Sequence, residues 1–265
     1  MNFCINLYKN SMCIICESKQ DDVKLVDPTT LDCSGCTLVT SIPYIPSLKR
    51  LYCLGCTSLT TIPVLPNLKN LNCSGCTSLT TIPVLPNLEI LSCMNCTALT
   101  SIPQILELFR LYCSNCTALT EIPHLPVLMH LNCTNCRRIT RIPDLPILST
   151  LSCVNCTALT EIPSLLNLSV LDCKYCTSLT KISEFPKIQF FYYEGCRWLP
   201  VRYEYEENIK SLRMCQAIWM RRLLRKRLEA ILPIITDIYY TPGNKGAMIA
   251  ERAFLARCSK AHPTK

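Results

Sequence analysis

Hydrophobic residues recur along this chain with a fixed spacing of twenty residues. From residue 31 to residue 190, eight consecutive blocks follow the pattern L-x-C-x-x-C-T-x-L-T-x-I-P-x-L-P-x-L-x-x without an insertion, as in LYCLGCTSLTTIPVLPNLKN at residues 51–70. A ninth block, residues 191–204, keeps only Phe191 and Cys196 of this pattern. Stacked copies of one short unit are typical of solenoids, in which each coil contacts its neighbours and an atypical last unit caps the stack.

Each block predicts one coil with a short strand. In L-x-C, Leu51 and Cys53 lie on one face of the strand and Tyr52 on the other, which is the alternation of a half-buried strand. Pro63 and Pro66 favour an extended or polyproline-like return segment. A single coil cannot bury its apolar residues, so the coils must stack. At roughly 4.8 Å per parallel strand, eight coils predict a curved solenoid about 35–40 Å long.

The repeat resembles the leucine-rich repeat in its shortest form, with the signature L-x-x-L-x-L-x-x-(N/C) present as Leu48, Leu51, Cys53 and Cys56. Its I-P-x-L-P segment is similar to the twenty-residue repeats of certain bacterial effectors, and C-x-x-L-T to the cysteine-containing class. The resemblance covers residues 31–190, roughly 60% of the chain. It implies an α/β-type solenoid dominated by β structure: a horseshoe with a parallel β-sheet on its concave face, an extended or polyproline-like convex side and a helical C-terminal cap.

The chain is therefore expected to contain four segments. Residues 1–30 form an N-terminal cap, residues 31–190 the eight leucine-rich repeats, residues 191–204 the degenerate capping repeat, and residues 205–265 a basic helical tail. Hydrophobic residues make up 49% of the chain, which excludes intrinsic disorder for most of it.

Cysteine is unusually frequent, with 22 residues, and sixteen of them lie in the C-x-x-C pairs of the repeat. Zinc sites and redox motifs use this spacing. However, the first cysteine of each pair takes an inward strand position, and the second takes the position at which the family places a buried Asn or Cys ladder. A buried thiol packs as a small hydrophobe with a weak S–H donor, so we predict structural, unbridged cysteines, with metal binding and redox chemistry as alternatives.

Three cysteines near the N-terminus, Cys4, Cys13 and Cys16, lie outside the repeat register. They are candidates for half of a zinc knuckle or the start of a RING-like element. The alternative, which we favour, is an N-terminal cap whose apolar residues pack on the first coil. No other metal site and no cofactor are expected.

The variable positions on the exposed face of the sheet are the candidate binding residues, because function in such a scaffold collects there. Small polar residues prevail, with tyrosines and apolar residues as possible anchors for a protein partner. The candidates are Tyr52, Leu54, Asn72, Met94, Tyr112, Asn132 and Lys174. No catalytic constellation is visible. We therefore predict a non-enzymatic, monomeric interaction scaffold that binds a protein on its concave face.

The net charge of +8 belongs mainly to the C-terminal tail, because residues 200–265 contain 13 Lys or Arg against six Asp or Glu. Residues 206–231 have the apolar spacing of an amphipathic helix and carry the basic residues Arg221, Arg222, Arg225, Lys226 and Arg227. The helix could close the last coil, bind nucleic acid or another polyanion, or attach to an anionic membrane. The run WMRRLLR and the later IYYTPGNKGA resemble a tail of repeat proteins from giant DNA viruses of amoebae, which implies a source more than an activity. The expected partner is an unidentified protein of the host.

An enzyme remains an alternative, namely a ubiquitin ligase like those that similar bacterial effectors carry after their repeats. Such domains centre on a Cys-x-Asp motif, whereas Cys215 and Cys258 are followed by Gln-Ala and Ser-Lys. No signal peptide is apparent, and no apolar run approaches the roughly 18 residues of a membrane span. We therefore expect an intracellular protein, in the cytoplasm of a host cell if it is viral.

Overall fold

The computed structural model describes residue 15 and residues 29–183 and 185–197. All of these belong to the first of the two units into which the chain divides, Met1–Arg213. Of the expected N-terminal cap, only Ile15, Thr29 and Thr30 are described, and Thr30 begins the first strand. The basic tail after residue 204 and the expected helical cap lie outside the described residues.

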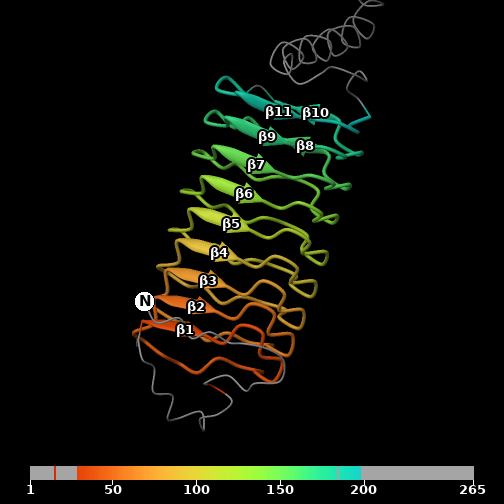
Figure 1. The fold of residues 1–265 in the computed structure, drawn as a ribbon. Coiled ribbons are helices and arrows are strands. Elements are labelled where there is room, and N and C mark those ends of the chain that lie inside the picture. The colour runs from red at the N-terminus through yellow and green to blue at the C-terminus, as the bar shows by residue number, and fades with distance from the viewer. Residues whose placement is uncertain (1–14, 16–28, 184, 198–265) are drawn as a thin grey trace, which may run out of the picture. The chain divides into compact units, whose positions relative to one another are not determined.

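One parallel sheet runs through every coil (Figure 1). Its nine strands are β1 (Thr30–Asp32), β2 (Arg50–Tyr52), β3 (Asn70–Asn72), β4 (Ile90–Ser92), β5 (Arg110–Tyr112), β6 (His130–Asn132), β7 (Thr150–Ser152), β9 (Val170–Asp172) and β11 (Phe190–Tyr192). Neighbours pair in a register of twenty residues, with Leu51 opposite Leu71. The predicted parallel solenoid of stacked twenty-residue coils is confirmed.

The strands begin one residue earlier than the pattern L-x-C predicts. Arg50 and Tyr52 lie on the outer side of β2 and flank the buried Leu51, while Cys53 follows the strand and is still buried. The backbone N–H of Cys53 still donates to the carbonyl of Asn72 at 2.8 Å, so the hydrogen bonds between neighbouring coils continue one residue beyond the strand. The residue before each leucine therefore joins the exposed face of the sheet.

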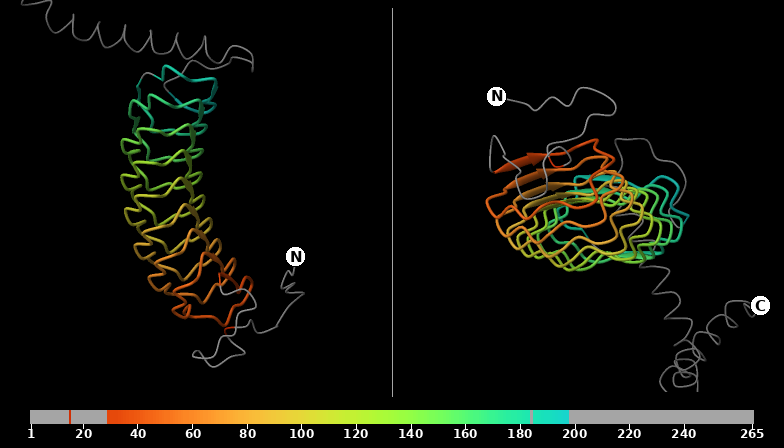
Figure 2. Two further views of the ribbon diagram at one scale, coloured as in Figure 1. Left: turned by 90° about the vertical axis from the view of Figure 1, so that its left-hand side faces the viewer. Right: turned by 90° about the horizontal axis from the view of Figure 1, so that it is seen from below.

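The return side of the coils is extended, as predicted, and carries a second, narrower set of parallel pairings. It comprises β8 (Glu161–Ile162), β10 (Lys181–Ile182) and the isolated bridges Ser41 to Thr61, Thr81 to Ser101 and Arg141 to Glu161. Figure 2 shows the stack of coils bending, with the main sheet along the inner side of the bend. A full horseshoe goes further than this bend and stays a prediction.

The core is a set of columns that run through the stack. Both cysteines of each pair are buried in all eight coils, and so are the repeated leucines and isoleucines, except for the half-buried Ile45 and Ile188. In the second coil, Leu51, Cys53, Cys56, Leu59 and Leu68 are 0% exposed. Because each column places identical side chains one above another, every interior coil has the same partners on both sides. The burial of the two cysteine columns agrees with the structural role predicted for them.

The second cysteine of each pair hydrogen-bonds to the preceding coil. The Sγ of Cys56 donates to the carbonyl of Cys33 at 3.0 Å, and the Sγ of Cys196 donates to the carbonyl of Cys173 at 3.1 Å. Six further coils repeat this bond, through Cys76, Cys96, Cys116, Cys136, Cys156 and Cys176. Among the described residues, none of the seventeen cysteines is part of a disulfide.

The first cysteine of each pair is an inert thiol. The hydrogen bond to the Cys136 thiol, together with complete burial, raises the pKa of Cys113 well above its usual value. In contrast, the hydrogen bond to the Cys113 thiol, against an opposing effect of burial, lowers the pKa of Cys136. The pKa values of Cys113 and Cys136 therefore shift in opposite directions, although both side chains are 0% exposed.

The turn between the two cysteines requires a left-handed backbone. The residue directly before the second cysteine has a positive φ. It is a glycine in the first three coils, namely Gly35, Gly55 and Gly75, with φ between 70° and 77°, and an asparagine in the next four. Glycine and asparagine tolerate this conformation best. The asparagines also form a side-chain ladder: the Nδ2 of Asn135 donates to the Oδ1 of Asn115 at 2.7 Å, and Asn115 and Asn155 make the equivalent bonds.

We predict that the two cysteine columns respond differently to truncation. Cys113→Ala and Cys116→Ala remove the same volume, but only the second also removes the S–H donor to the Cys93 carbonyl. Cys116→Ala should therefore be less stable than Cys113→Ala by about 1 kcal/mol in urea unfolding. Cys116→Ser, which keeps a donor, should recover part of this difference. Equal losses from the two alanine variants would contradict a structural role for the ladder.

A second prediction concerns Tyr175, which occupies the left-handed turn position with φ of 59°. Tyr175→Asn should raise the free energy of unfolding by about 1 kcal/mol, because asparagine tolerates this backbone and can donate to the Oδ1 of Asn155. Tyr175→Ala is the control, since it loses the same ring and gains neither advantage. Thermal or urea unfolding of the three proteins measures the effect, and an alanine variant as stable as the asparagine variant would refute it.

Candidate partner-binding surface

The exposed face of the main sheet is called here the sheet face. In each coil it consists of the first and third residues of the strand and of the residue two places after the end of the strand, as in Arg50, Tyr52 and Leu54. Four predicted binding residues, Tyr52, Asn72, Tyr112 and Asn132, are the third residues of β2, β3, β5 and β6. The other three, Leu54, Met94 and Lys174, follow β2, β4 and β9. All seven predicted residues therefore lie on this face.

An open hollow of about 350 Å³ lies on the sheet face between β2 and β5, lined by Tyr52, Asn70, Leu71, Asn72, Ile90, Ser92, Met94 and Tyr112. It brings together four of the predicted residues, with a tyrosine on each flanking strand. Sequence reasoning missed Asn70 and Ile90, because it placed the residue before the leucine outside the strand. The signal in the sequence is their fixed place one residue before Leu71 and Leu91, but it becomes informative only once the strand is known to begin there.

Three predicted residues lie outside this hollow, and two of them have local partners. The Oδ1 of Asn132 accepts from the Ser114 hydroxyl at 2.8 Å and from the Thr134 backbone N–H at 3.1 Å. Lys174 lies 3.6 Å from the Asp172 carboxylate. The third, Leu54, is 47% exposed.

The charge on the sheet face has one sign between β2 and β7. Its exposed positions carry Arg50, Arg110 and His130 and no carboxylate from residue 50 to residue 154. The Arg110 guanidinium stacks on the Phe109 ring at 4.9 Å, and the Phe109 and His130 rings meet edge to face at 6.1 Å. Burial, followed by the nearby Arg110, lowers the pKa of His130, so this imidazole is neutral at pH 7.

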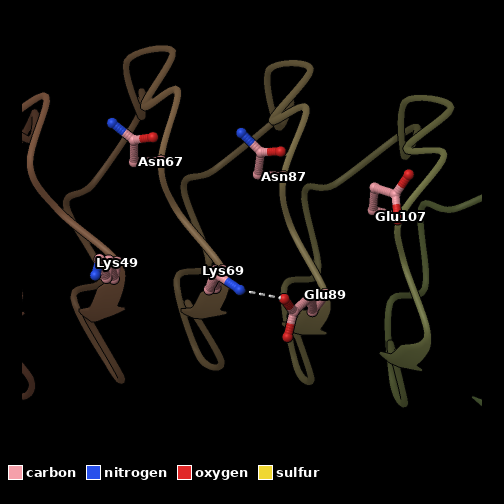
Figure 3. A pocket seen from close by; sticks show the side chains of 6 residues that line it. All are labelled: Lys49, Asn67, Lys69, Asn87, Glu89 and Glu107. Carbon is pink, nitrogen blue, oxygen red and sulfur yellow. Dashed lines mark hydrogen bonds and ion pairs between the residues drawn. The ribbon is translucent and has the colours of Figure 1, made fainter.

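A second surface, called here the lateral band, contains the residues one place before and one place after the buried leucine that precedes each strand. Its N-terminal half is a polar hollow of about 340 Å³ lined by Lys49, Asn67, Lys69, Asn87, Glu89 and Glu107 (Figure 3). Lys69 and Glu89 form an ion pair at 2.7 Å. The asparagines are structural: the Nδ2 of Asn67 donates to the Pro46 carbonyl at 2.8 Å, and that of Asn87 to the Pro66 carbonyl at 2.7 Å.

The lateral band becomes apolar in the next coils, where Phe109, Val127, Met129 and Ile147 take its positions. Val127 and Ile147 occupy the position of Asn67, Asn87 and Asn167 in other coils. The coils of Val127 and Ile147 therefore lack the hydrogen bond from an asparagine amide to a proline carbonyl of the preceding coil. Ile147 is 40% exposed and Met129 36%. The repeat is thus compatible with polar residues at these sites, and the apolar ones are not required by the fold.

The remaining candidate sites of the sequence cannot be placed. Cys4, Cys13 and Cys16, the basic residues Arg221 to Arg227, and Cys215 and Cys258 all lie outside the described residues. Within the described part of the chain, no three His, Cys, Asp or Glu residues are grouped as a metal site would need. No helix in that same part is long and apolar enough to cross a bilayer.

The chain was compared with known proteins. No family model matches it, and no curated protein matches it. Among solved structures, a leucine-rich repeat protein from Bacteroides ovatus is similar at 14% identity with a TM-score of 0.27, covering 62% of this chain and 78% of that one.

We predict that Ile147→Asn does not destabilise the protein. The new amide can donate to the Pro126 carbonyl, as Asn167 does to Pro146 in the next coil, so the free energy of unfolding should stay unchanged or rise by up to about 1 kcal/mol. Ile147→Ser loses the same apolar surface without an amide and should be less stable than Ile147→Asn. A clear loss in the asparagine variant, seen in urea unfolding, would show that Ile147 is needed by the core.

Proposed function

We propose that this protein is a non-enzymatic scaffold that binds another protein on the sheet face of its solenoid. The observation that carries the proposal is the hollow between Tyr52 and Tyr112, where two half-buried aromatic side chains flank Ile90 and Met94. Tyrosine is enriched at binding hot spots because it offers a large contact area and a polar group at low entropic cost. The solenoid provides a rigid support, since every strand is tied to its neighbours.

The surroundings of the hollow suit a protein partner. Its polar residues are amide and hydroxyl groups, Asn70, Asn72 and Ser92, which can pair with a backbone as well as with side chains. An open depression also suits a protruding side chain of a protein. We infer an intracellular, monomeric scaffold with a host protein as partner if the chain is viral. Polyanion binding through Arg221 to Arg227 and ligase activity stay separate predictions.

The test is affinity capture from an extract of cells that express the protein, with wild-type chain and two variants as bait. Tyr52→Ala with Tyr112→Ala should lose the partner, because a hot-spot tyrosine contributes about 1–2 kcal/mol, or roughly tenfold in affinity. Tyr44→Ala is the matched control, since Tyr44 is 64% exposed on the return side of the coil. Quantitative mass spectrometry should find proteins that the double variant loses and Tyr44→Ala keeps.

Circular dichroism and thermal unfolding establish that the double variant still folds. If it folds and captures the same proteins as wild type, the sheet-face proposal is refuted. If Tyr44→Ala is the variant that loses them, binding belongs to the return side instead.

A further inference from the structure

The apolar part of the lateral band lies outside the hollow to which the proposed function assigns the partner. Its residues are Phe109, Val127, Met129 and Ile147. Phe109 and Met129 lie side by side in neighbouring coils, because the backbone N–H of Met129 donates to the carbonyl of Phe109 at 3.0 Å. Met129 is 36% exposed and Ile147 is 40% exposed, so an apolar surface faces outward here.

The fold does not require apolar residues at these positions. In the next coil, Ser149 occupies the position of Met129 and Asn167 occupies that of Ile147. The Asn167 amide donates to the Pro146 carbonyl at 2.8 Å, a hydrogen bond that the coil of Ile147 lacks. Ile147 therefore exposes apolar surface where the stack of coils is equally compatible with a hydrogen-bonded amide, which favours a binding role for the isoleucine.

An unpaired cation borders this apolar surface. The guanidinium of Arg110 lies 4.9 Å from the centre of the Phe109 ring, and its Nε is buried without a hydrogen bond. No carboxylate in the part of the chain that the structure describes pairs with Arg110. Stacking on an aromatic ring occupies the face of a guanidinium and leaves its edge for a carboxylate. The surface thus combines exposed apolar groups with a position for one anion.

The acidic residues of the lateral band determine from which side an anion can approach. Glu89 is bound to Lys69 at 2.7 Å. Glu107 is exposed and forms no ion pair within the described residues. An acidic group of a partner is therefore attracted to Arg110 and repelled by Glu107. A partner that pairs with Arg110 extends away from the acidic coils, toward Ile147.

The spacing of the residues restricts the form of the partner. Met129 lies one strand step and one residue from Arg110, which is about 6 Å, and Ile147 lies two steps and three residues away, which is about 14 Å. In an extended peptide, residues i+2 and i+4 are roughly 7 and 13 Å from residue i. All three point to the same side. An acid at i can thus reach Arg110 while apolar residues at i+2 and i+4 cover Met129 and Ile147.

We propose that Arg110 and the apolar part of the lateral band form a second binding surface, for an extended protein segment of the form acid-x-apolar-x-apolar. The carboxylate pairs with Arg110. The first apolar side chain lies on Phe109 and Met129, and the second lies on Val127 and Ile147. This surface goes beyond the sheet-face scaffold, because it uses a different side of the coils.

Isothermal titration calorimetry with the full-length protein tests the proposal at low salt. The probe is the peptide GSESLSLSG, capped at both ends so that its glutamate carries the only charge. Two control peptides are GSKSLSLSG, in which the charge is reversed, and GSELSLSSG, which has the same composition but turns both leucines to the side opposite the glutamate. The probe should bind, and both controls should bind at least tenfold more weakly. Binding should weaken as the salt concentration rises.

Three protein variants remove the proposed contacts one at a time. Arg110→Gln should weaken the probe about tenfold, which is the weight of one charge-assisted contact. Met129→Ser and Ile147→Asn should each weaken it about fivefold, since each removes part of the apolar contact. Both introduce the residue that the next coil carries at the same position, so the fold is preserved. Circular dichroism and thermal unfolding check this for all three variants.

Two further variants are matched controls. Val64→Ser shortens an apolar side chain that is 53% exposed on the return side, and Arg138→Gln neutralises an arginine that is exposed in a turn. Both should bind the probe as the wild type does. Equal binding of the three peptides, no binding of the probe at millimolar concentration, or wild-type affinity in Arg110→Gln and Ile147→Asn would overturn the proposal.

The same titrations separate this surface from the proposed function. If Tyr52→Ala weakens the probe and Ile147→Asn does not, the peptide lies in the sheet-face hollow and the lateral-band proposal is wrong. The probe needs no natural partner, so its loss from Ile147→Asn supports the lateral band whatever the capture experiment finds. Unchanged capture by the folded tyrosine double variant refutes the sheet-face proposal alone.

Discussion

The contact on which the stack depends is the hydrogen bond from the second cysteine of each coil to the carbonyl of the first cysteine in the coil before. The carbonyl of the first cysteine is buried where the strand ends and accepts a backbone N–H from its own coil, as that of Cys93 does from Cys96 at 3.3 Å, which leaves a lone pair for a second donor. A thiol is small enough for the column and still donates, as Cys116 does to Cys93 at 3.0 Å. The hydrogen bond with the Cys136 thiol, together with burial, raises the pKa of Cys113 and keeps this thiol protonated and apolar. The abundance of cysteine is thus a packing solution repeated once per coil.

The same repetition separates structural polar residues from those that the fold does not need. Asparagine recurs at two positions of the coil, each time with the same kind of hydrogen bond. Asn67 donates to a proline carbonyl and Asn135 to the asparagine of the preceding coil, so stability explains why these residues are present. Ile90 and Arg110, in contrast, belong to a column whose residue changes from coil to coil, and Ile147 stands where Asn67, Asn87 and Asn167 carry an amide. Residues that differ from the equivalent residues of other coils, and that the fold does not require, are the best candidates for a role in binding.

Position in the coil determines what each of these residues can do. Ile90 lies in the hollow between Tyr52 and Tyr112, where an apolar group from a partner can be covered. Arg110 lies at the border of the sheet face and the lateral band, with Phe109 beneath its guanidinium. The rigid ladder of strands fixes Arg110 and Phe109 next to the coil of Met129, so charge and apolar surface at this border act together rather than as separate patches.

The repeat period, the parallel sheet, the extended return side and the burial of both cysteine columns could be predicted from the sequence, because identical residues at one spacing leave stacking as the only way to bury them. Tyr52, Asn72, Met94 and Tyr112 could likewise be named from their alternation with buried residues. What the sequence alone did not determine is the extent of the strand. Cys53 is buried after β2 has ended, while Arg50 belongs to the strand, so the alternation of buried and exposed residues alone does not mark its limits. The tertiary structure therefore decided that Asn70 and Ile90 line the hollow and that Arg110 borders the apolar part of the lateral band, since these residues come together only when coils twenty residues apart are stacked.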